Sequence, residues 1–326
     1  MTDETQTQHC GVVALIGAPN AGKSTLINAL VGSKIAIVTP KVQTTRQALR
    51  GVQIVDQTQI IYTDTPGIFN APQAYEQAMV SHAWSAAGEA DVVLVVVDAS
   101  QTSYFFSGDT PPADGESDAN ATRRALHGDM AQALKDIFQK VARYTKPKIL
   151  VLNKVDKMPK PKLLALIAWL NQHAVFDETF MISALKGEGV GELQQWLASK
   201  MPEGPWLFPE DQLSDMPLRF LAAEITREKL FMRLREELPY GLMVETEAWE
   251  EKKDGSVKIN QVIIVQRDGH KKIVLGKNGE QLKAIGQSAR RDIAQMMECP
   301  VHLFLFIKVI PDWKDRREYL PGQQLM

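Results

Sequence analysis

The sequence has little cysteine and no apolar run long enough to cross a bilayer. Its 326 residues include only Cys10 and Cys299, too few for a disulfide scaffold or a zinc ribbon. The most apolar runs, Val92–Val97 and Val301–Ile307, are far shorter than the roughly 20 residues of a membrane-spanning helix. Residues 1–10 form a polar tail that lacks the basic start and apolar core of a signal peptide. We therefore expect a soluble, intracellular chain in a reducing compartment.

Neither sign of charge dominates. The chain has 37 Lys and Arg against 39 Asp and Glu, for a formal net charge of −2, so any surface for nucleic acid must be local. Hydrophobic residues make up 44% and charged residues 23%, which is ordinary globular usage and excludes a largely disordered chain. The length exceeds that of one typical domain and suits two.

Residues 11–200 alternate short apolar runs with longer amphipathic stretches. This alternation predicts an α/β domain with a doubly wound, mostly parallel sheet. The expected strands are Val12–Ile16, Gln59–Tyr62, Val92–Val97, Ile149–Leu152 and Thr179–Ile182. The expected helices are Lys23–Val31, Gln73–Ala87, Thr122–Arg143, Pro161–His173 and Gly191–Ser199. Residues 101–121 carry four acids, no base and no period, and predict either a mobile insertion or an ordered acidic loop that contacts a partner.

The composition changes after residue 200. Pro202, Gly204, Pro205 and Pro209 indicate a linker over 201–216. The pattern over 217–310 then predicts a smaller α+β domain of order αββααβ, followed by a tail over 311–326. That tail contains Trp313, Tyr319 and a short basic run, and it either caps the second domain or contacts the ligand of that domain.

A phosphate-binding motif follows the first expected strand and opens a helix. It fits G-x-x-x-x-G-K-[ST] and consists of Gly17, Ala18, Pro19, Asn20, Ala21, Gly22, Lys23 and Ser24, with Thr25 next in the helix. The glycines allow backbone N–H groups to surround phosphate oxygens at a helix N-terminus. Lys23 would reach the β- and γ-phosphates, and the Ser24 hydroxyl would ligate Mg²⁺.

Further motifs follow other strands in the same order along the chain. Asp64, at a strand end, can hold Mg²⁺ through water, and the Gly67 N–H group at the end of the Asp64-Thr65-Pro66-Gly67 run can sense the γ-phosphate. Asn153-Lys154-Val155-Asp156 follows the fourth expected strand. There the Asp156 carboxylate can accept two hydrogen bonds from the edge that guanine has and adenine lacks, while the Lys154 stem lies along the base.

The last motif, Ser183-Ala184-Leu185, can offer N–H groups to guanine O6. Because the carboxyl ends of the strands meet at one edge of a doubly wound sheet, we expect all these loops to form one GTP site.

Residues 11–200 resemble the GTPase domain of translation-factor-related proteins. The stretch Pro40-Lys41-Val42-Gln43-Thr44-Thr45-Arg46 resembles the first switch of the Era family of small-subunit assembly GTPases. The resemblance implies a P-loop GTPase domain in which either Thr44 or Thr45 ligates Mg²⁺; the sequence leaves both open. With the second domain, the resemblance covers nearly the whole chain.

Ile68 and Phe69 stand where many GTPases carry a water-orienting Gln. Since neither side chain polarises water, we predict slow intrinsic hydrolysis. In GTPases that this chain resembles, an Asn at the position of Asn20 helps hold K⁺ against the phosphates. The alternatives for Asn20 are K⁺-stimulated hydrolysis and a structural role within the loop.

A second glycine motif, Gly276-Lys277-Asn278-Gly279, resembles the G-x-x-G loop of a KH domain, and the expected element order αββααβ is similar to that of the type II variant. Such a loop lets backbone approach a sugar–phosphate chain in a groove for about four single-stranded nucleotides. Residues 267–291 contain seven bases and two acids, a local excess of five positive charges. Lys271, Lys272, Lys277 and Lys283 are the candidate RNA contacts. The apolar side chains Val262, Ile264, Ile273, Leu275, Leu282 and Ile285 are expected in the core.

The sequence therefore predicts a GTP-hydrolysing switch joined to an RNA-binding domain. The family resemblance implies 16S rRNA near its 3′ end as partner, a role in assembly of the 30S subunit, GTP or GDP with Mg²⁺ as cofactors, a monomer and a cytoplasmic location. It also implies loose association with the inner face of the cell membrane. The alternatives are a membrane-associated regulatory GTPase and a non-hydrolysing, GTP-dependent RNA adaptor.

Overall fold

The computed structural model describes residues 7–39, 41, 45, 48–69, 71, 74–102, 132–316 and 319, and it divides into two compact units. The first unit contains residues up to Ile35 and those from Thr45 to Asp215. The second contains the chain from Met216 onward together with a short segment after Ile35.

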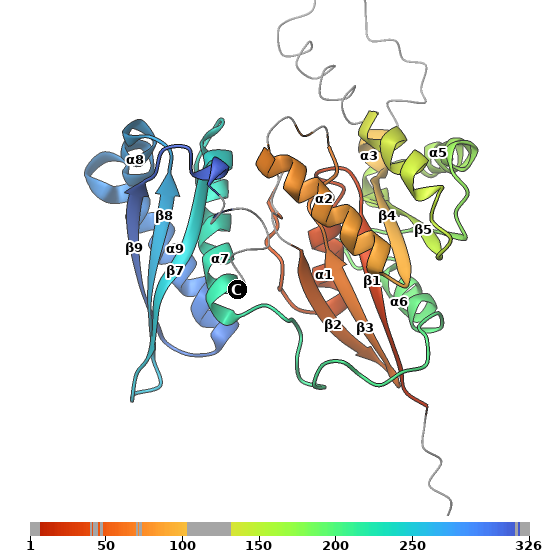
Figure 1. The fold of residues 1–326 in the computed structure, drawn as a ribbon, viewed down its shortest axis with the longest axis horizontal. Helices are drawn as coiled ribbons and strands as arrows, with labels where there is room; N and C mark the ends of the chain where they lie inside the picture. Colours follow the sequence, from red (N-terminus) through yellow and green to blue (C-terminus); the bar gives the residue numbers. More distant parts are fainter. Residues whose placement is uncertain are drawn as a thin grey trace, which may run out of the picture. The chain divides into compact units, whose positions relative to one another are not determined.

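The first unit is built on a six-stranded sheet of order β2-β3-β1-β4-β5-β6 (Figure 1). Strand β2 is antiparallel to β3, and the other neighbouring pairs are parallel. The doubly wound, mostly parallel sheet is thus confirmed. Its strands are β1 (His9–Ile16), β2 (Leu49–Val55), β3 (Thr58–Asp64), β4 (Val92–Asp98), β5 (Lys148–Asn153) and β6 (Glu178–Met181).

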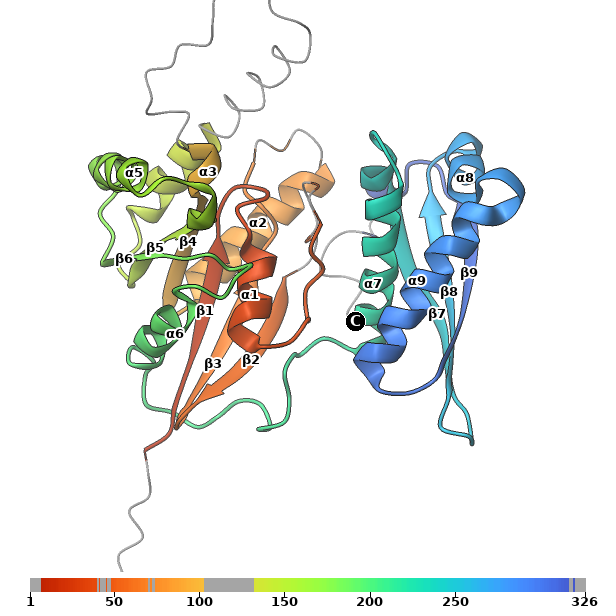
Figure 2. The same cartoon turned by 180° about the vertical axis from the view of Figure 1, so that it is seen from behind.

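Helices cover both faces of this sheet. Helices α1 and α6 contact each other and strands β2 and β3 on one face of the sheet (Figure 2), and α2 lies on the other face (Figure 1). The α2 face buries a continuous apolar cluster that includes Ala83, Val95, Phe138 and Leu166. The helices are α1 (Lys23–Val31), α2 (Ala74–Glu89), α3 (Ala99–Thr102), a helical stretch over 132–141, α5 (Lys160–His173) and α6 (Val190–Ala198), with a 3₁₀ turn over Val155–Lys157.

Most expected elements of this unit lie within a few residues of the observed ones, but β2 is not among the strands predicted. Of the predicted insertion, Gln101 and Thr102 end α3, and 103–121 lie outside the described residues. The same holds for 122–131 of the predicted helix 122–143.

The segment predicted as a linker is hydrogen-bonded to the first unit. The Val52 N–H group of β2 donates to the Leu213 carbonyl at 2.9 Å. The fully buried Gln59 amide accepts from the N–H groups of Leu207 and Phe208 at 2.8 and 3.0 Å, and it donates to the Phe208 carbonyl at 2.8 Å. The chain between Glu203 and Asp215 therefore runs as a strap along β2 and β3 of this unit.

The second unit has the predicted element order αββααβ. It consists of α7 (Leu218–Arg233), β7 (Leu242–Glu251), β8 (Val257–Val265), α8 (Asp268–Leu275), α9 (Glu280–Met297) and β9 (Val301–Val309), with 3₁₀ turns at Leu238–Gly241, Lys277–Gly279 and Trp313–Asp315. Strand β8 pairs antiparallel with β7 and parallel with β9. Helices α7 and α9 bury apolar side chains such as Leu230, Ile285 and Ile293 against this sheet.

The apolar side chains that were expected in the core of this unit are not all buried. Val262, Ile264 and Ile285 are buried as expected, whereas Ile273 is exposed and its neighbour Val274 is buried, so the assignment of Ile273 to the core is wrong.

Trp313 is fully buried, and its indole N–H group donates to the Gly241 carbonyl at 3.1 Å. At Trp313 the C-terminal segment therefore caps the unit; residues 317, 318 and 320–326 lie outside the described part. Among the described residues, no helix combines the length and apolarity needed to cross a membrane.

Candidate functional site

The phosphate-binding motif forms the turn between β1 and α1. Gly22 adopts φ +96°, and a Cβ atom there would lie 2.2 Å from the Asn153 amide nitrogen, so the position requires glycine. Helix α1 begins at Lys23 with no side-chain cap, which leaves its first N–H groups directed at the loop. The N-terminal end of a helix carries partial positive charge and favours an anion.

The Lys23 ammonium group is folded back onto this loop. Its Nζ donates to the carbonyl oxygens of Gly17 and Ala18, each at 3.1 Å. Burial lowers the pKa of Lys23 to about 8, although the charge of Asp64 opposes the shift. Among the described residues, two carbonyls and a nearby carboxylate hold this buried cation, an arrangement well suited to an anionic ligand.

Three oxygen-bearing side chains meet beside Lys23. The Ser24 hydroxyl donates to Asp64 Oδ2 at 2.7 Å, the Thr45 hydroxyl donates to the same oxygen at 2.9 Å, and the two hydroxyls lie 2.9 Å apart. Asp64 is fully buried, and its Oδ1 atom has no hydrogen-bond partner among the described residues. Burial raises the pKa of Asp64, and the charge of Lys23 opposes that rise. Oxygen donors around a buried carboxylate fit Mg²⁺.

The motif after β3 packs directly on the phosphate-binding loop. The Thr65 hydroxyl donates to the Leu15 carbonyl at 2.6 Å, and the Ile68 N–H group donates to the Gly17 carbonyl at 3.0 Å. A Cβ atom at Gly67 would lie 2.8 Å from the Pro19 backbone, so only glycine allows this approach. Pro66, which stands between Thr65 and Gly67 in the chain, is buried.

Asn153 connects three of the predicted motifs. Its amide nitrogen donates to the Ala21 carbonyl at 2.9 Å, and its Oδ1 accepts from the N–H groups of Lys154 and Ala184 at 2.8 and 3.0 Å. The phosphate loop, the Asn153 turn and the loop after β6 are therefore held together by one side chain.

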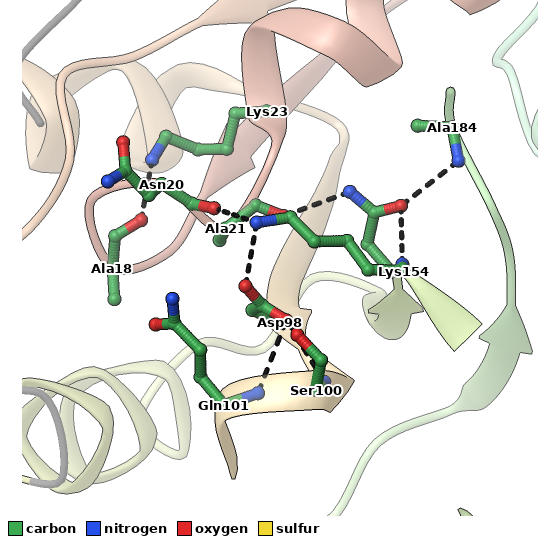
Figure 3. A network of polar contacts seen from close by, with 10 residues as sticks. Ala18, Asn20, Ala21, Lys23, Asp98, Ser100, Gln101, Lys154 and Ala184 are labelled. Atoms are coloured by element: carbon green, nitrogen blue, oxygen red, sulfur yellow. Dashed lines mark hydrogen bonds and ion pairs between the residues drawn. The ribbon is translucent and has the colours of Figure 1, made fainter. Parts of the chain in front are cut away.

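Lys154 crosses the phosphate-binding loop toward β4. Its ammonium group donates to the Asn20 carbonyl at 2.7 Å and to Asp98 Oδ2 at 2.6 Å (Figure 3). Asp98 is nearly buried, and its Oδ1 also accepts from the Ser100 hydroxyl at 2.6 Å. Asp98 is a candidate site residue that was not predicted from the sequence. An acid directly after the Val92–Val97 run was the available signal, because the other strand ends carry candidate site residues.

The remaining base-side residues lie in the same loops. Asp156 Oδ2 is 3.8 Å from the Lys186 ammonium group. The Ser183 side chain is buried, its hydroxyl has no hydrogen-bond partner among the described residues, and Leu185 is exposed. The Ala184 N–H group already donates to Asn153. Thr25 is half-buried on α1, Asn20 has φ +61°, and Thr44 lies outside the described residues.

We expect Lys23 to make the stability of the ligand-free protein depend on pH. Its pKa is about 8 in the folded state and 10.5 as an ordinary lysine, so between these values the unfolded chain binds more protons and stability rises with pH. The free energy of unfolding increases by at most roughly 3 kcal/mol over this pH range. Urea unfolding of wild type and Lys23→Met at pH 7.5 and pH 10 measures it. The free energy of unfolding of wild type relative to that of Lys23→Met should be higher at pH 10 than at pH 7.5. A difference that stays constant with pH would contradict the buried ammonium group.

The second predicted site is the glycine loop between α8 and α9. Gly276 has φ +71°, and a Cβ atom there would lie 2.6 Å from Gln281 Cβ, whereas Gly279 has φ +78° and open space around it. Lys272, Lys277, Asn278 and Lys283 are exposed and Lys271 is half-buried. A hollow of about 370 Å³ beside the loop is lined by Arg233, Gly276, Lys277, Glu280, Gln281 and Ala284. The loop thus exposes backbone and positive charge together.

Sequence comparisons identify both units. A family model described as "50S ribosome-binding GTPase" matches residues 12–154, and one described as "KH domain" matches residues 237–314. The chain is 52% identical over 312 residues to GTPase Era of Brucella suis biovar 1 (strain 1330), which spans 96% of this chain and 91% of the relative. It is 51% identical over 320 residues to GTPase Era of Mesorhizobium japonicum, with 97% and 94% covered.

Structure comparisons give the same answer. A crystal structure of Era in complex with MgGDPNP and nucleotides 1506–1542 of 16S ribosomal RNA matches with a TM-score of 0.80 and 37% identity, over 98% of both chains. A variant of Aquifex aeolicus Era bound to GDP and AlF4⁻ matches with a TM-score of 0.79 and 37% identity, over 98% of this chain and 99% of the other.

Proposed function

We propose, since this chain belongs to the Era family of GTPases, that it couples GTP hydrolysis to its hold on the RNA of the small ribosomal subunit. The chain binds GTP and GDP with Mg²⁺ and hydrolyses GTP, as its family does. Membership in a GTPase family rules against the non-hydrolysing adaptor. The role of each residue in binding the nucleotide and the RNA is proposed below.

The single observation that carries the nucleotide assignment is the bonding of Asn153. One side chain joins the Ala21 carbonyl of the phosphate loop to the Ala184 N–H group of the last motif. This arrangement supports a binding site shared by these loops at the carboxyl edge of the sheet, where doubly wound folds bind ligands. The proposed nucleotide contacts are Gly17 to Thr25, Asp64 to Gly67, Asn153, Lys154, Asp156 and Ser183 to Leu185.

At the triphosphate end, Lys23 would contact the β- and γ-phosphates and Ser24 would ligate Mg²⁺. Asp64 would hold the ion through water, and the Gly67 N–H group would meet the γ-phosphate. Thr45 is favoured over Thr44 as the switch ligand, because its hydroxyl already lies 2.9 Å from both Ser24 Oγ and Asp64 Oδ2.

At the base end, the Asp156 carboxylate would accept from guanine N1–H and N2–H₂, and the Lys154 stem would lie along the ring. Lys154 is pre-oriented by Asp98 and the Asn20 carbonyl. Because the Ala184 N–H group donates to Asn153, its contact to guanine O6 would share that hydrogen.

For the second unit we propose 16S rRNA as the ligand and assembly of the 30S subunit as the process. The relative crystallised with nucleotides 1506–1542 of 16S rRNA supports this. The proposed contacts are Gly276, Lys277, Asn278, Gly279, Lys271, Lys272 and Lys283. GTP would order the segments around Thr45 and Gly67 and thereby change RNA affinity, and hydrolysis would reverse the change. RNA affinities measured with GDPNP and with GDP test this coupling; equal affinities would contradict it.

We expect K⁺ to stimulate hydrolysis. Ile68 and Phe69 offer no polar group to orient water, so a cation held near Asn20 would supply charge at the phosphates. Steady-state phosphate release in KCl and in NaCl at equal ionic strength, with and without RNA, should give a rate about tenfold or more higher in KCl, the scale of one well-placed electrostatic contact. Equal rates would leave Asn20 with a structural role in its loop.

Subunit assembly supports a cytoplasmic location. The monomeric state, the loose peripheral association with the inner face of the membrane and the rival membrane-associated regulatory role stay predictions. Liposome flotation against RNA pull-down separates a membrane role from the RNA role.

A further inference from the structure

The open face of the β7-β8-β9 sheet carries two exposed aromatic side chains. Along β9, Leu303, Leu305 and Ile307 pack into the core beneath the helices, so the alternate residues point to the opposite face. There Phe304 is 47% exposed and Phe306 is 53% exposed. Figure 1 looks onto this face with α9 behind the sheet, and Figure 2 shows α7 and α9 on the other side.

Polar and basic side chains of β8 and β9 surround this pair. The strand register places Lys258 beside His302 and Asn260 beside Phe304, while the buried apolar side chains Val262 and Ile264 lie beside Phe306 and Lys308. The Lys258 ammonium group lies 5.9 Å from the centre of the Phe304 ring, which confirms that they share one face. We call Lys258, Asn260, His302, Phe304, Phe306 and Lys308 the aromatic face.

The charge of the sheet is divided between its strands. Strands β8 and β9 contain Lys258, His302 and Lys308 and no acid. The acids stand on β7, as Glu245, Glu247, Glu250 and Glu251, with Glu250 3.9 Å from Lys258. An anionic partner would therefore follow the β9 side of the sheet and avoid β7.

The aromatic face adjoins the proposed RNA groove across one strand. β9 is the edge of its sheet. Its inner side chain Leu305 would touch a Cβ atom at Gly286 of α9, at 3.4 Å, and α8, which leads into the glycine loop, also contacts β9. One side of β9 thus borders the helices that carry the glycine loop, and the other carries the two phenylalanines.

We propose that the aromatic face binds the continuation of the single-stranded RNA held at Gly276–Gly279, with bases stacked on Phe304 and Phe306. This rests on the proposed RNA function and extends its site around the β9 edge. Exposed aromatic rings on a sheet stack bases irrespective of sequence, and nearby Lys side chains contact phosphates.

The test compares a long RNA with short ones. The long probe spans nucleotides 1506–1542 of 16S rRNA, as in the relative's complex, and the short probes are hexanucleotides tiled across it. The double variant Phe304→Ala/Phe306→Ala should bind the long probe about tenfold or more weakly than wild type, given the strength of base–aromatic stacking. Its affinity for the best-bound hexanucleotide should equal that of wild type. Phe304→Tyr/Phe306→Tyr should restore binding. Met232→Ala, an exposed apolar side chain on α7, is the matched control.

The outcomes separate this inference from the RNA function itself. Undiminished long-probe binding by the double alanine variant would overturn the inference, and the face would then suit a protein partner. Equal losses for long and short probes would also overturn it, because they would report damage to the groove. If wild type binds neither probe, the proposed RNA function fails first.

Discussion

Replacing Asp156 with Asn should lower GTP affinity by about a thousandfold and create measurable affinity for XTP. The carboxylate is proposed to accept two hydrogen bonds from guanine, and an amide keeps one acceptor oxygen but turns an N–H group toward the other donor. Sites built to hydrogen-bond a substrate reject an analogue that lacks the bonding group by about 10⁴ to 10⁵, and the one retained bond makes the expected loss smaller. Xanthine replaces the exocyclic amine with an oxygen, which the new amide can bond.

Competition of GTP, XTP and ATP against a fluorescent guanine nucleotide measures the change. Asp211→Asn removes one charge from an exposed aspartate of the same unit and should leave all three affinities as in wild type. Unchanged GTP affinity in Asp156→Asn would show that the base is bound elsewhere.

Replacing Gly279 with Asp should weaken RNA binding about 5- to 150-fold and leave GTP binding unchanged. The range corresponds to roughly 1–3 kcal/mol for losing backbone contacts and placing a negative charge against phosphate. Apart from its chain neighbours, no heavy atom of the described residues lies within 4 Å of a Cβ atom at Gly279, so the aspartate fits at the modest cost of a left-handed residue. Gly276 is a poorer target because Gln281 blocks its Cβ position.

Gly255 provides the matched control. It lies in the same unit with φ +79° and equally open surroundings, so Gly255→Asp adds the same charge and the same backbone strain away from the glycine loop. Filter binding with the fragment of nucleotides 1506–1542 compares the variants. Similar losses in both would attribute the effect to net charge or folding, and no loss in Gly279→Asp would move the RNA groove elsewhere.

Motifs with fixed spacing made the nucleotide site predictable from the sequence. Gly22 and Gly67 are required by close approaches to Asn153 and Pro19, and such steric requirements leave a residue signature. The parallel sheet then brings the loops together, because continuous apolar runs identify its buried strands.

Strand β2 could not be predicted in the same way. Its sequence, Leu-Arg-Gly-Val-Gln-Ile-Val, mixes polar residues with an interior glycine that normally weakens a strand. The structure explains Gly51: a Cβ atom there would lie 2.5 Å from Ile35 Cδ1, which is a tertiary contact. The strap between Glu203 and Asp215 escaped prediction for a related reason, since prolines indicate irregular chain but not its hydrogen bonds.

Single residues were hardest to assign where their role depends on distant partners. Asp98 meets Lys154, 56 positions away in the chain, and its place at a strand end was the one signal that the sequence offered. Ile273 follows the apolar spacing of a core residue, but α8 is short and turns that side chain outward.

The central claim is that the loops around Lys23, Asp64, Asn153 and Asp156 bind GTP. Isothermal titration of GTP into the purified full chain with excess Mg²⁺ tests it most directly. One nucleotide should bind per chain, with ATP giving no heat of binding. A chain that gives no heat with GTP under these conditions would contradict the account.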